Sequence, residues 1–433
     1  MATNHPPPRV GRWVALIGIP VAVAALLGAC TDLPNESAAS TTATASAPAA
    51  TSTPSASGEP VVAHETKPVA SGAELVERFQ CARCHDGART AEVPRDKHCV
   101  QCHFQIGEGS FKAPPDILAM WKPRVMHLRF VPSLSGIGRL VKPAWAEQFL
   151  MRPFDLRPSS HPEMPRLALD AVEAQAIVAH LAAGAPPVGS DATPAGDVSR
   201  GRVLFDTKTC STCHTFTGAG TRVPQLLEPS KMQRDRTLAP DLRFARERLI
   251  PERVAAYIAD PASVKPDAAM PKLDISREEA ADLAAFVLRT PLDAVAPPAA
   301  PPRLPLLERV VSYDEVADKV LHKICWHCHS QPDYARGDGG PGNTGGFGFA
   351  ARKLDLSSYE SIASGYLDRA GERQSLFSKG PGGEPLLLEA LLARQRETRG
   401  TIGEIRGMPL GLPALSAEDI QLVETWIAQG HPR

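Results

Sequence analysis

The chain has 433 residues, which is long for one domain and suits about three of ordinary size. Its formal net charge is −1, so no overall field attracts it to nucleic acid or to an anionic membrane surface. Aromatic residues make up only 5%, whereas proline occurs 42 times. This composition indicates modest cores joined by extended linkers, unless a cofactor supplies apolar bulk.

The N-terminal residues predict export. Arg9 and Arg12 precede the apolar run "WVALIGIPVAVAALLGA", which ends in small residues directly before Cys30. This pattern predicts a signal peptide over residues 1–29, because the run is too short to span a membrane comfortably. Because "LLGAC" also resembles the bacterial lipobox, we predict that Cys30 is lipidated; the alternatives are an ordinary signal peptide or a short uncleaved anchor.

Residues 30–70 are mostly Ala, Ser, Thr and Pro without periodicity, which predicts a lipidated, disordered tether. We therefore expect an exported lipoprotein, anchored to a membrane on its periplasmic side. Thr31 rather than Asp follows Cys30, which by resemblance to Gram-negative lipoproteins favours the outer membrane.

Two proline-rich stretches, near residues 190 and 300, divide the remaining chain into three blocks. Such stretches act as semi-rigid spacers, so we expect tandem domains. The predicted domains cover residues 71–184, 195–291 and 306–433.

Each block repeats one plan. It opens with an amphipathic helix, predicted to be capped by a serine, that runs into a Cys-x-x-Cys-His motif. It closes with Met-Pro, a turn, and a last helix whose apolar residues recur at three- and four-residue spacing, which predicts an all-α fold. The predicted serine caps are Ser71, Ser199 and Ser312 for the opening helices, and Ser276 and Ser416 for the last helices of the second and third blocks.

Four Cys-x-x-Cys-His motifs hold eight of the nine cysteines. Two thiols at this spacing can bond the two vinyl groups of a porphyrin, and the histidine behind them then lies under the ring centre, within reach of the iron. We therefore predict four covalently bound haem c groups, with iron. The predicted attachment residues are Cys81, Cys84, Cys99, Cys102, Cys210, Cys213, Cys325 and Cys328. The predicted proximal iron ligands are His85, His103, His214 and His329.

Two other uses of paired cysteines were weighed. A thioredoxin-like dithiol needs a βαβ context and gives no reason for the histidine. Zinc is the stronger rival, since Cys81 to Cys102 has ribbon-like spacing. Zinc does not demand a histidine after each pair, however. With 13 histidines in 433 residues, four chance placements have odds on the order of one in a million, so haem is favoured.

The opposite face of each iron needs a second ligand. Met164, Met270 and Met408 each follow a motif, precede a proline and lie before a closing helix. Core packing is the alternative role for a methionine. Because the same placement occurs three times, we predict that these methionines are distal iron ligands.

The second block resembles the class I cytochromes c over nearly its whole length, through "CSTCH", "APDL" and "MPKLDISREEAADLAAFVL". The resemblance implies that His214 and Met270 hold the iron between them and that Pro240 shapes the haem pocket. The third block resembles the cytochrome c domains of planctomycete-type multidomain proteins, through "KLDLSSYESIASG", "GEPLLLEALL" and "MPLGLPALSAEDIQLVETWIAQG". It departs from them by the insertion "RGDGGPGNTGGFGFA".

The first block resembles the second half of a cytochrome c from "PSLSGIGRL" onward, but it inserts a second motif, "CVQCH". Met164 is assigned to the first haem. For the second haem the candidates are His127, which we choose, and Met120, Met126, His98 and His161, and this haem can also lack a distal protein ligand.

These features predict a tetrahaem c-type cytochrome that transfers electrons between periplasmic or membrane redox partners, with no nucleic-acid partner. Iron closed on both faces can do little except change valence. The alternative is a multihaem oxidoreductase, peroxidase-like or a small-molecule reductase, with an open iron at the Cys99/Cys102 haem. No convincing acid–base set surrounds that motif, so an electron carrier rather than an enzyme is favoured.

Overall fold

The computed structural model describes residues 70–91, 93, 98–123, 125, 127–154, 156–157, 164–189, 195–221, 233–296, 299–325, 328–330, 353–368 and 370–433. All of them belong to one unit, Thr66–Arg433. The predicted signal peptide, the lipidation site and the tether up to residue 69 lie outside the described residues. So do Met126, His161 and the side chain of Met120.

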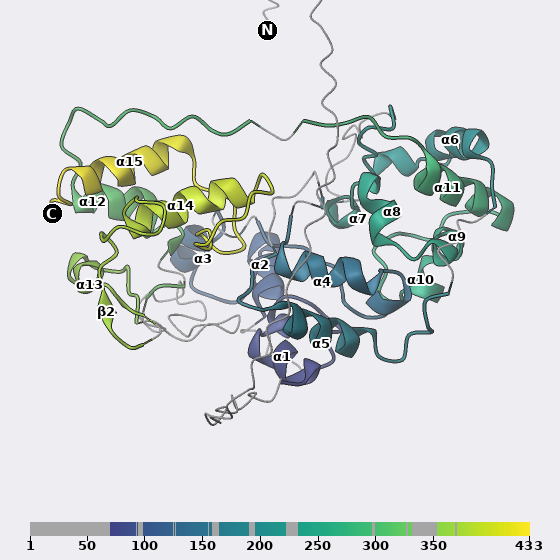
Figure 1. The fold of residues 1–433 in the computed structure, drawn as a ribbon, viewed down its shortest axis with the longest axis horizontal. Helices are drawn as coiled ribbons and strands as arrows, with labels where there is room; N and C mark the ends of the chain where they lie inside the picture. Colours follow the sequence, from purple (N-terminus) through teal and green to yellow (C-terminus); the bar gives the residue numbers. More distant parts are fainter. Residues whose placement is uncertain are drawn as a thin grey trace, which may run out of the picture. The chain divides into compact units, whose positions relative to one another are not determined.

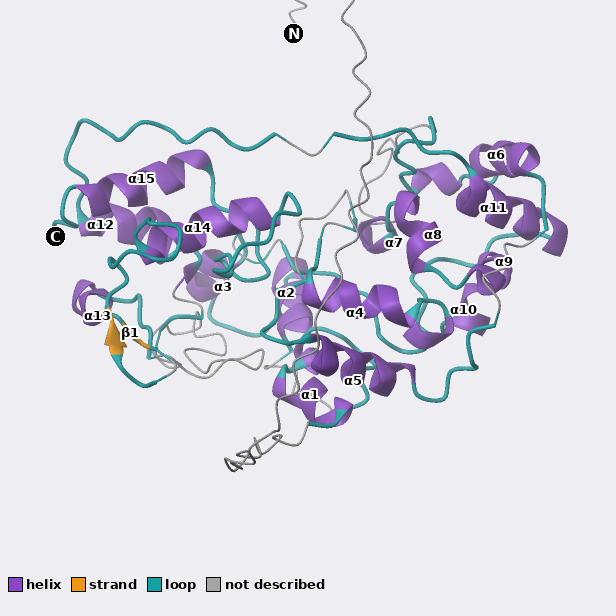
Figure 2. Ribbon diagram, viewed as in Figure 1, coloured by secondary structure: helices purple, strands orange, loops and turns teal. Residues whose placement is uncertain are grey.

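The described part of the chain is mostly helical (Figure 2). Within it, no helix is both long and apolar enough to cross a membrane.

Residues 71–184 form a helical frame around one apolar cluster. Its elements are α1 (Gly72–Arg78), η1 (Cys81–Arg83), α2 (Cys99–Glu108), α3 (Pro115–Trp121), η3 (Ile137–Arg139), α4 (Pro143–Met151) and α5 (Ala171–Ala182). Helix α1 packs against α5 (Figure 1), and Leu75, Phe79 and Ile177 are buried between them. Ser71 caps α1 as predicted, in a capping box with Glu74.

Residues 195–291 repeat this frame. Their elements are α6 (Val198–Thr207), η4 (Cys210–Thr212), α7 (Gln233–Leu238), η5 (Leu242–Phe244), α8 (Ala245–Arg248), α9 (Pro251–Ala259), α10 (Pro261–Val264) and α11 (Arg277–Arg289). Ser276 caps α11 as predicted. The prediction for the opening helix was wrong: α6 begins at Val198, and Asp197 accepts the capping hydrogen bond from the Arg200 N–H, so Ser199 lies inside the helix.

The opening and closing helices of both frames cross at a glycine. A Cβ at Gly72 would lie 2.1 Å from the carbonyl oxygen of Ala176, and a Cβ at Gly201 would lie 2.1 Å from that of Asp282. Real Cβ atoms do not approach an oxygen so closely, so glycine is what lets each opening helix lie against its closing helix. Because each opening helix leads directly into its Cys-x-x-Cys-His motif, this crossing places the motif at one end of the helix pair.

Residues 306–433 contain the third helical core, which centres on Trp426. Their elements are α12 (Tyr313–Val316), the π-helix η6 (Ala317–Leu321), α13 (Tyr359–Ser364), β1 (Tyr366–Leu367), β2 (Arg373–Gln374), α14 (Leu386–Glu397) and α15 (Ala417–Ala428). Ser312 and Ser416 cap α12 and α15 as predicted. The strands pair antiparallel, with Tyr366 opposite Gln374, so this part departs from the all-α prediction by a short hairpin.

The boundary between residues 71–184 and 195–291 is a packed surface. Leu140 and Val141 are buried in the same apolar cluster as Phe205 and Phe286, and Trp145 of α4 packs against that cluster. Backbone hydrogen bonds cross the boundary as well, for example from the Lys142 N–H to the Arg248 carbonyl at 2.8 Å. These two segments of the chain therefore share a core, although a linker joins them.

Candidate functional site

The first and third motifs adopt one tight turn, and the described ends of the fourth motif make the same hydrogen bond. In each, the N–H of the histidine donates to the carbonyl of the first cysteine, at 2.9 Å for His85, 2.9 Å for His214 and 3.0 Å for His329. The residues before the first and third turns, Gln80 and Thr209, have left-handed backbone with φ of 55° and 63°. This turn holds the two thiols and the imidazole on a few consecutive residues, which is the arrangement that haem attachment needs.

The second motif is different because it forms the first turn of the α-helix α2. Its N-cap is His98, whose ring nitrogen Nδ1 accepts the Gln101 N–H at 3.2 Å. His98 is only 5% exposed and its Nε2 lies 3.5 Å from an Asp86 carboxylate oxygen. The structure therefore gives His98, one of the alternatives for a distal ligand, a capping role beside its own motif.

All four motif histidines hydrogen-bond a main-chain group further along the chain. Nδ1 lies 2.8 Å from the Pro132 carbonyl for His85. The corresponding distance is 3.3 Å to the His127 carbonyl for His103 and 3.0 Å to the Pro240 carbonyl for His214. His329 bonds the main chain of Leu354.

These bonds fix the state of the rings. A carbonyl can only accept, so Nδ1 carries the proton and Nε2 is left with a free lone pair for a metal. Burial lowers the pKa of His85, His214 and His329 below the ordinary value, which favours the neutral imidazole that iron requires. Orientation and protonation thus both suit an axial iron ligand.

The segment from His127 to Pro132 serves both motifs of the first block. Its first carbonyl faces His103 and its last faces His85. The ring of His127 lies edge-on to that of His103, with centroids 5.5 Å apart. The structure therefore brings His127 to the second motif through its carbonyl on Nδ1, and its assignment as the distal ligand stays a prediction.

The cysteines do not resemble a redox dithiol. Burial raises the pKa of Cys81 and Cys210 to about 11 and that of Cys325 to about 12. Catalytic dithiols need a lowered pKa, because the thiolate is the reactive form. The surroundings of these thiols are apolar, which fits the edge of a porphyrin.

The first two motifs lie beside each other. The Cys84 thiol is hydrogen-bonded to Cys99, and this contact raises its pKa. Even so, no three His, Cys, Asp or Glu side chains gather as metal ligands within the described residues, which include Cys81, Cys84, Cys99 and Cys102.

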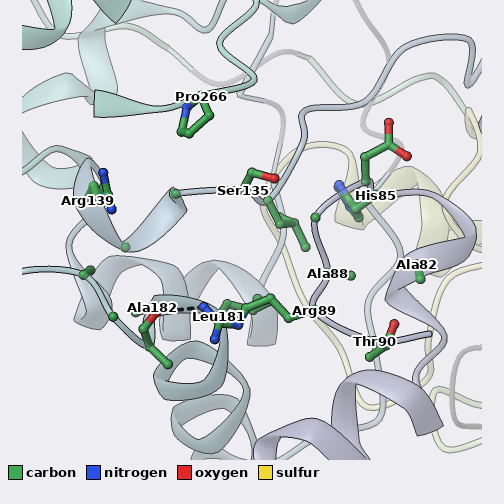
Figure 3. Close-up of a pocket in the computed structure, with 18 of the residues that line it drawn as sticks. Ala82, His85, Ala88, Arg89, Thr90, Ser135, Arg139, Leu181, Ala182 and Pro266 are labelled. Carbon is green, nitrogen blue, oxygen red and sulfur yellow. Dashed lines mark hydrogen bonds between the residues drawn. The ribbon is translucent and has the colours of Figure 1, made fainter. Parts of the chain in front are cut away.

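A cavity of about 770 Å³ adjoins His85 (Figure 3). Its walls include Ala82 of the motif and Arg139, the last residue of η3, with Pro266 contributed from beyond α10. Arg89 crosses toward the end of α5, where it donates to the Ala183 carbonyl at 2.8 Å (Figure 3). The volume of the cavity is in the range of cofactor sites. Arg89 and Arg139 suit a ligand with anionic groups.

Two of the three predicted methionine ligands pack against the cores of their blocks. Met164, like Cys81, packs against the cluster that includes Leu75, and Met408, like Cys325, packs against the cluster that includes Trp426. Met270 is half-buried in the turn before α11. Their bonds to iron stay predictions.

The main-chain partners of the histidines, apart from Pro240, are not among the residues predicted from the sequence to shape the site. A signal was present, because "VPSL", "APDL" and "KLDL" place Pro132, Pro240 and Leu354 at the same point of a short repeated pattern. His127 has no such neighbours, and only the structure identifies its carbonyl as the partner of His103.

Comparison with known proteins gives one match. The family profile described as cytochrome c matches residues 198–291. No curated protein and no solved structure matches the chain. A cytochrome c domain implies haem c, haem-based electron transfer and redox-protein partners, and the neutral, carbonyl-bonded His214 fits that group. The segment 198–291 of this mostly helical chain is a cytochrome c domain.

Proposed function

We propose that the whole chain is a tetrahaem c-type cytochrome that carries electrons between redox proteins. Its three tandem cytochrome c-like domains, residues 71–184, 195–291 and 306–433, would hold two, one and one haem groups. The linkers keep these domains at high local concentration, so that electrons can pass in series. The formal net charge of −1 means that partners must recognise local patches.

One observation carries this proposal beyond the matched segment. The histidines of the other three motifs have the same kind of main-chain partner as His214. A buried ring N–H needs an acceptor in any fold, and a main-chain acceptor for the imidazole at every motif is also what is required if each one must present Nε2 to iron. The observation therefore supports haem at each motif rather than at one.

The chain's own residues would do four jobs. The cysteine pairs hold the group covalently, and the carbonyls of Pro132, His127, Pro240 and the main chain of Leu354 orient the histidines. Met164, Met270 and Met408, as ligands of the iron, would favour its reduced state and raise its reduction potential. The apolar cores exclude water. Haem c, when bound, supplies an iron that alternates between two valence states.

We also propose that the protein is exported and anchored to a membrane on the periplasmic side, with the outer membrane favoured, by a lipid on Cys30. The apolar run before Cys30 and the residue after it support this proposal. The intact mass of the purified parent chain should show acyl chains on Cys30, and these should be absent from the Cys30→Ser variant. A parent chain without acyl chains would refute the lipid anchor.

The test of the main proposal is a haem count. The intact mass of the purified chain and its haem-to-protein ratio should both give four haem groups, one for each motif. A count of one, confined to Cys210 and Cys213, would leave only the matched domain as a cytochrome and refute the tetrahaem proposal.

The second candidate function is an enzyme with an open iron at the Cys99/Cys102 haem. The contact between the His127 carbonyl and Nδ1 of His103 favours this function. It puts the His127 carbonyl on the side of the His103 ring away from Nε2, the atom that would bind the iron. Carbon monoxide separates the two functions, because it binds only iron with a vacant or weakly held sixth position. An unchanged spectrum of the reduced protein supports a carrier. A change of about one haem in four that disappears in the Cys99→Ser/Cys102→Ser variant supports the enzyme.

A further inference from the structure

The loop of Met164 in the first block contacts the third block. Arg166, two residues after Met164, has its Nη1 3.2 Å from a carboxylate oxygen of Glu397, the last residue of α14. The same nitrogen donates to the Gly403 carbonyl at 2.9 Å. The Arg166 side chain is 19% exposed and that of Glu397 is 4% exposed, so water is largely excluded from the ion pair. It therefore differs from the solvated surface pairs that contribute little to stability.

The same carboxylate holds the loop of Met408. Gly407, directly before Met408, donates its N–H at 2.9 Å to the Glu397 oxygen that faces Arg166. A Cβ at Gly407 would lie 2.5 Å from the other oxygen of this carboxylate, so glycine is what allows the close approach. The Met408 N–H donates to the Ala390 carbonyl at 2.9 Å. Two successive residues thus fix this loop to α14.

Arg394 holds the Glu397 carboxylate from within the third block. Its Nη1 lies 3.5 Å from the second oxygen of Glu397, and its Nε donates to the Leu412 carbonyl at 2.8 Å. Both side chains of this pair are buried. Opposite charges in the interior stabilise each other, because either one left unpaired there is costly. Glu397 is therefore held by one arginine of its own block and is met by a second arginine from the first block.

The motifs of the two blocks approach each other as well. The charges of Cys99 and Arg83, in the first block, act on the Cys328 thiol of the fourth motif. Charges further apart than about 10 Å are largely screened, so these groups are neighbours. Two separate parts of the third block, its motif and the end of α14, therefore lie near the first block.

We propose that Glu397 is a positioning residue for two sites at once. It holds the loop of Met408 through the Gly407 N–H and the loop of Met164 through Arg166, and the ion pair docks the third block on the first beside both methionines. This inference rests on the tetrahaem function and the methionine ligation proposed above. It adds a coupling between two sites that separate domains on a linker would not have.

A shared carboxylate makes the two sites depend on each other. Such a coupling is reciprocal: if the contact helps to hold Met164, it helps to hold Met408 by the same free energy. A substitution in the third block therefore acts on the haem of Met164, and one in the first block acts on the haem of Met408.

The experiment measures how firmly each methionine is held in the full four-haem chain. Imidazole is a good ligand for iron, so it competes with methionine at the oxidised haem groups. A titration with imidazole, followed by the visible spectrum, gives an apparent affinity for each component. The components of Met164 and Met408 are identified by the tighter imidazole binding that appears in the Met164→Ala and Met408→Ala variants.

Glu397→Gln should raise the imidazole affinity at the haem of Met164 by about fivefold. This value is at the low end of typical couplings, because Arg166 is partly exposed. The glutamine can still accept the Gly407 N–H, so the effect reports the lost charge facing Arg166. Arg166→Gln should act equally at this haem and should also raise the affinity at the haem of Met408. The double variant should do no more than either single one, because both remove one bond.

Two further variants separate this contact from a general loss of charge. Arg166→Lys, which keeps the charge, should restore most of the parent affinity. Arg78→Gln is the matched control, because Arg78 pairs with Glu173 inside the first block. It should leave every component unchanged.

An unchanged affinity at the haem of Met164 in Glu397→Gln, or additive effects in the double variant, would overturn the shared carboxylate. If Glu397→Gln fails to accumulate because Arg394 loses its partner charge, Arg166→Gln carries the test through its effect at the haem of Met408. A parent chain with fewer than four haem groups, or without methionine on iron, would refute the function proposed above. That outcome is seen before any variant is made, so the two failures are distinguishable.

Discussion

Residues 71–184 and 195–291 use one frame for different numbers of motifs. In both, an opening helix crosses a closing helix at a glycine, Gly72 or Gly201, and runs into a tight Cys-x-x-Cys-His turn. His214 meets its carbonyl 26 residues later, whereas His85 meets its carbonyl only after 47 residues. The extra length of the first block holds the second motif with α2 and α3.

This difference shows how the helical frame can hold a second Cys-x-x-Cys-His motif. The insertion ends at the stretch from His127 to Pro132, which faces both His103 and His85. The original bond of His85 is therefore kept, and the new histidine uses a carbonyl from the same stretch. The later half of the first block still pairs with the corresponding part of residues 195–291, through the bridge between Val141 and Leu249.

The largest expected effect comes from comparing loss of the third motif, which belongs to the frame common to both segments, with loss of the second motif, which lies in the insertion of the first block. The double variant Cys210→Ser/Cys213→Ser should lose one haem and destabilise the domain by about 4 kcal/mol or more, because Cys210 packs against the cluster of Phe205 and Phe286. The double variant Cys99→Ser/Cys102→Ser should also lose one haem but leave the contact of α1 with α5 intact. Intact mass and limited proteolysis measure the two effects. Equal resistance to proteolysis in both variants would contradict the distinction.

The next effect tests the glycine crossing. Gly201→Ala puts a Cβ 2.1 Å from the Asp282 carbonyl and 2.7 Å from the Phe286 Cβ, so the helices must separate, at a cost of up to about 3 kcal/mol. Gly72→Ala should cost less, since Gly72 is the first residue of α1 and the end of a helix can shift more easily. Gly403→Ala meets nothing within 4 Å and serves as the control. The loss of thermal stability should decrease in the order Gly201→Ala, Gly72→Ala, Gly403→Ala. A Gly201→Ala variant as stable as the control would contradict the predicted clash.

The sequence predicts the local features well. Serine caps, motif turns and the amphipathic closing helices follow from neighbours within a few residues, as at Ser71, Ser276 and Ser416. The wrong cap at Ser199 has a local cause too, because Asp197 is an equally good acceptor two residues earlier. Such features need no knowledge of the rest of the chain.

Features that depend on contacts between distant segments could not be predicted. The carbonyl of His127 is a main-chain group, so its residue type carries no signal of its bond to His103. The boundary at Val141 and Leu249 joins residues 108 positions apart, and a proline-rich linker between them suggested separate domains instead. Arg166 looks like an ordinary surface arginine until the third block brings Glu397 to it.

The smallest effect compares the ion pairs that join the opening and closing helices. In the second frame, Asp282 of α11 is 3% exposed and accepts from Arg200 Nε at 2.8 Å and from the Asp197 N–H at 2.6 Å. The Arg200 contact, followed by the Asp197 N–H, lowers the pKa of Asp282. In the first frame, Arg78 pairs with Glu173, whose side chain is 21% exposed.

Asp282→Asn should therefore destabilise the protein by about 1 kcal/mol at pH 7, a modest figure because Arg200 is largely exposed. Glu173→Gln should cost about 0.5 kcal/mol or less, because a glutamine can still complete the capping box with Asp170. Since the folded-state pKa of Asp282 is depressed, its contribution is present above the unfolded value of about 3.9 and is lost as the pH falls through the lower folded value. Thermal unfolding at pH 7 and below pH 4 should show the gap between the parent and Asp282→Asn narrowing in acid. A gap that stays constant would mean that the Asp282 carboxylate is not held by Arg200 in solution.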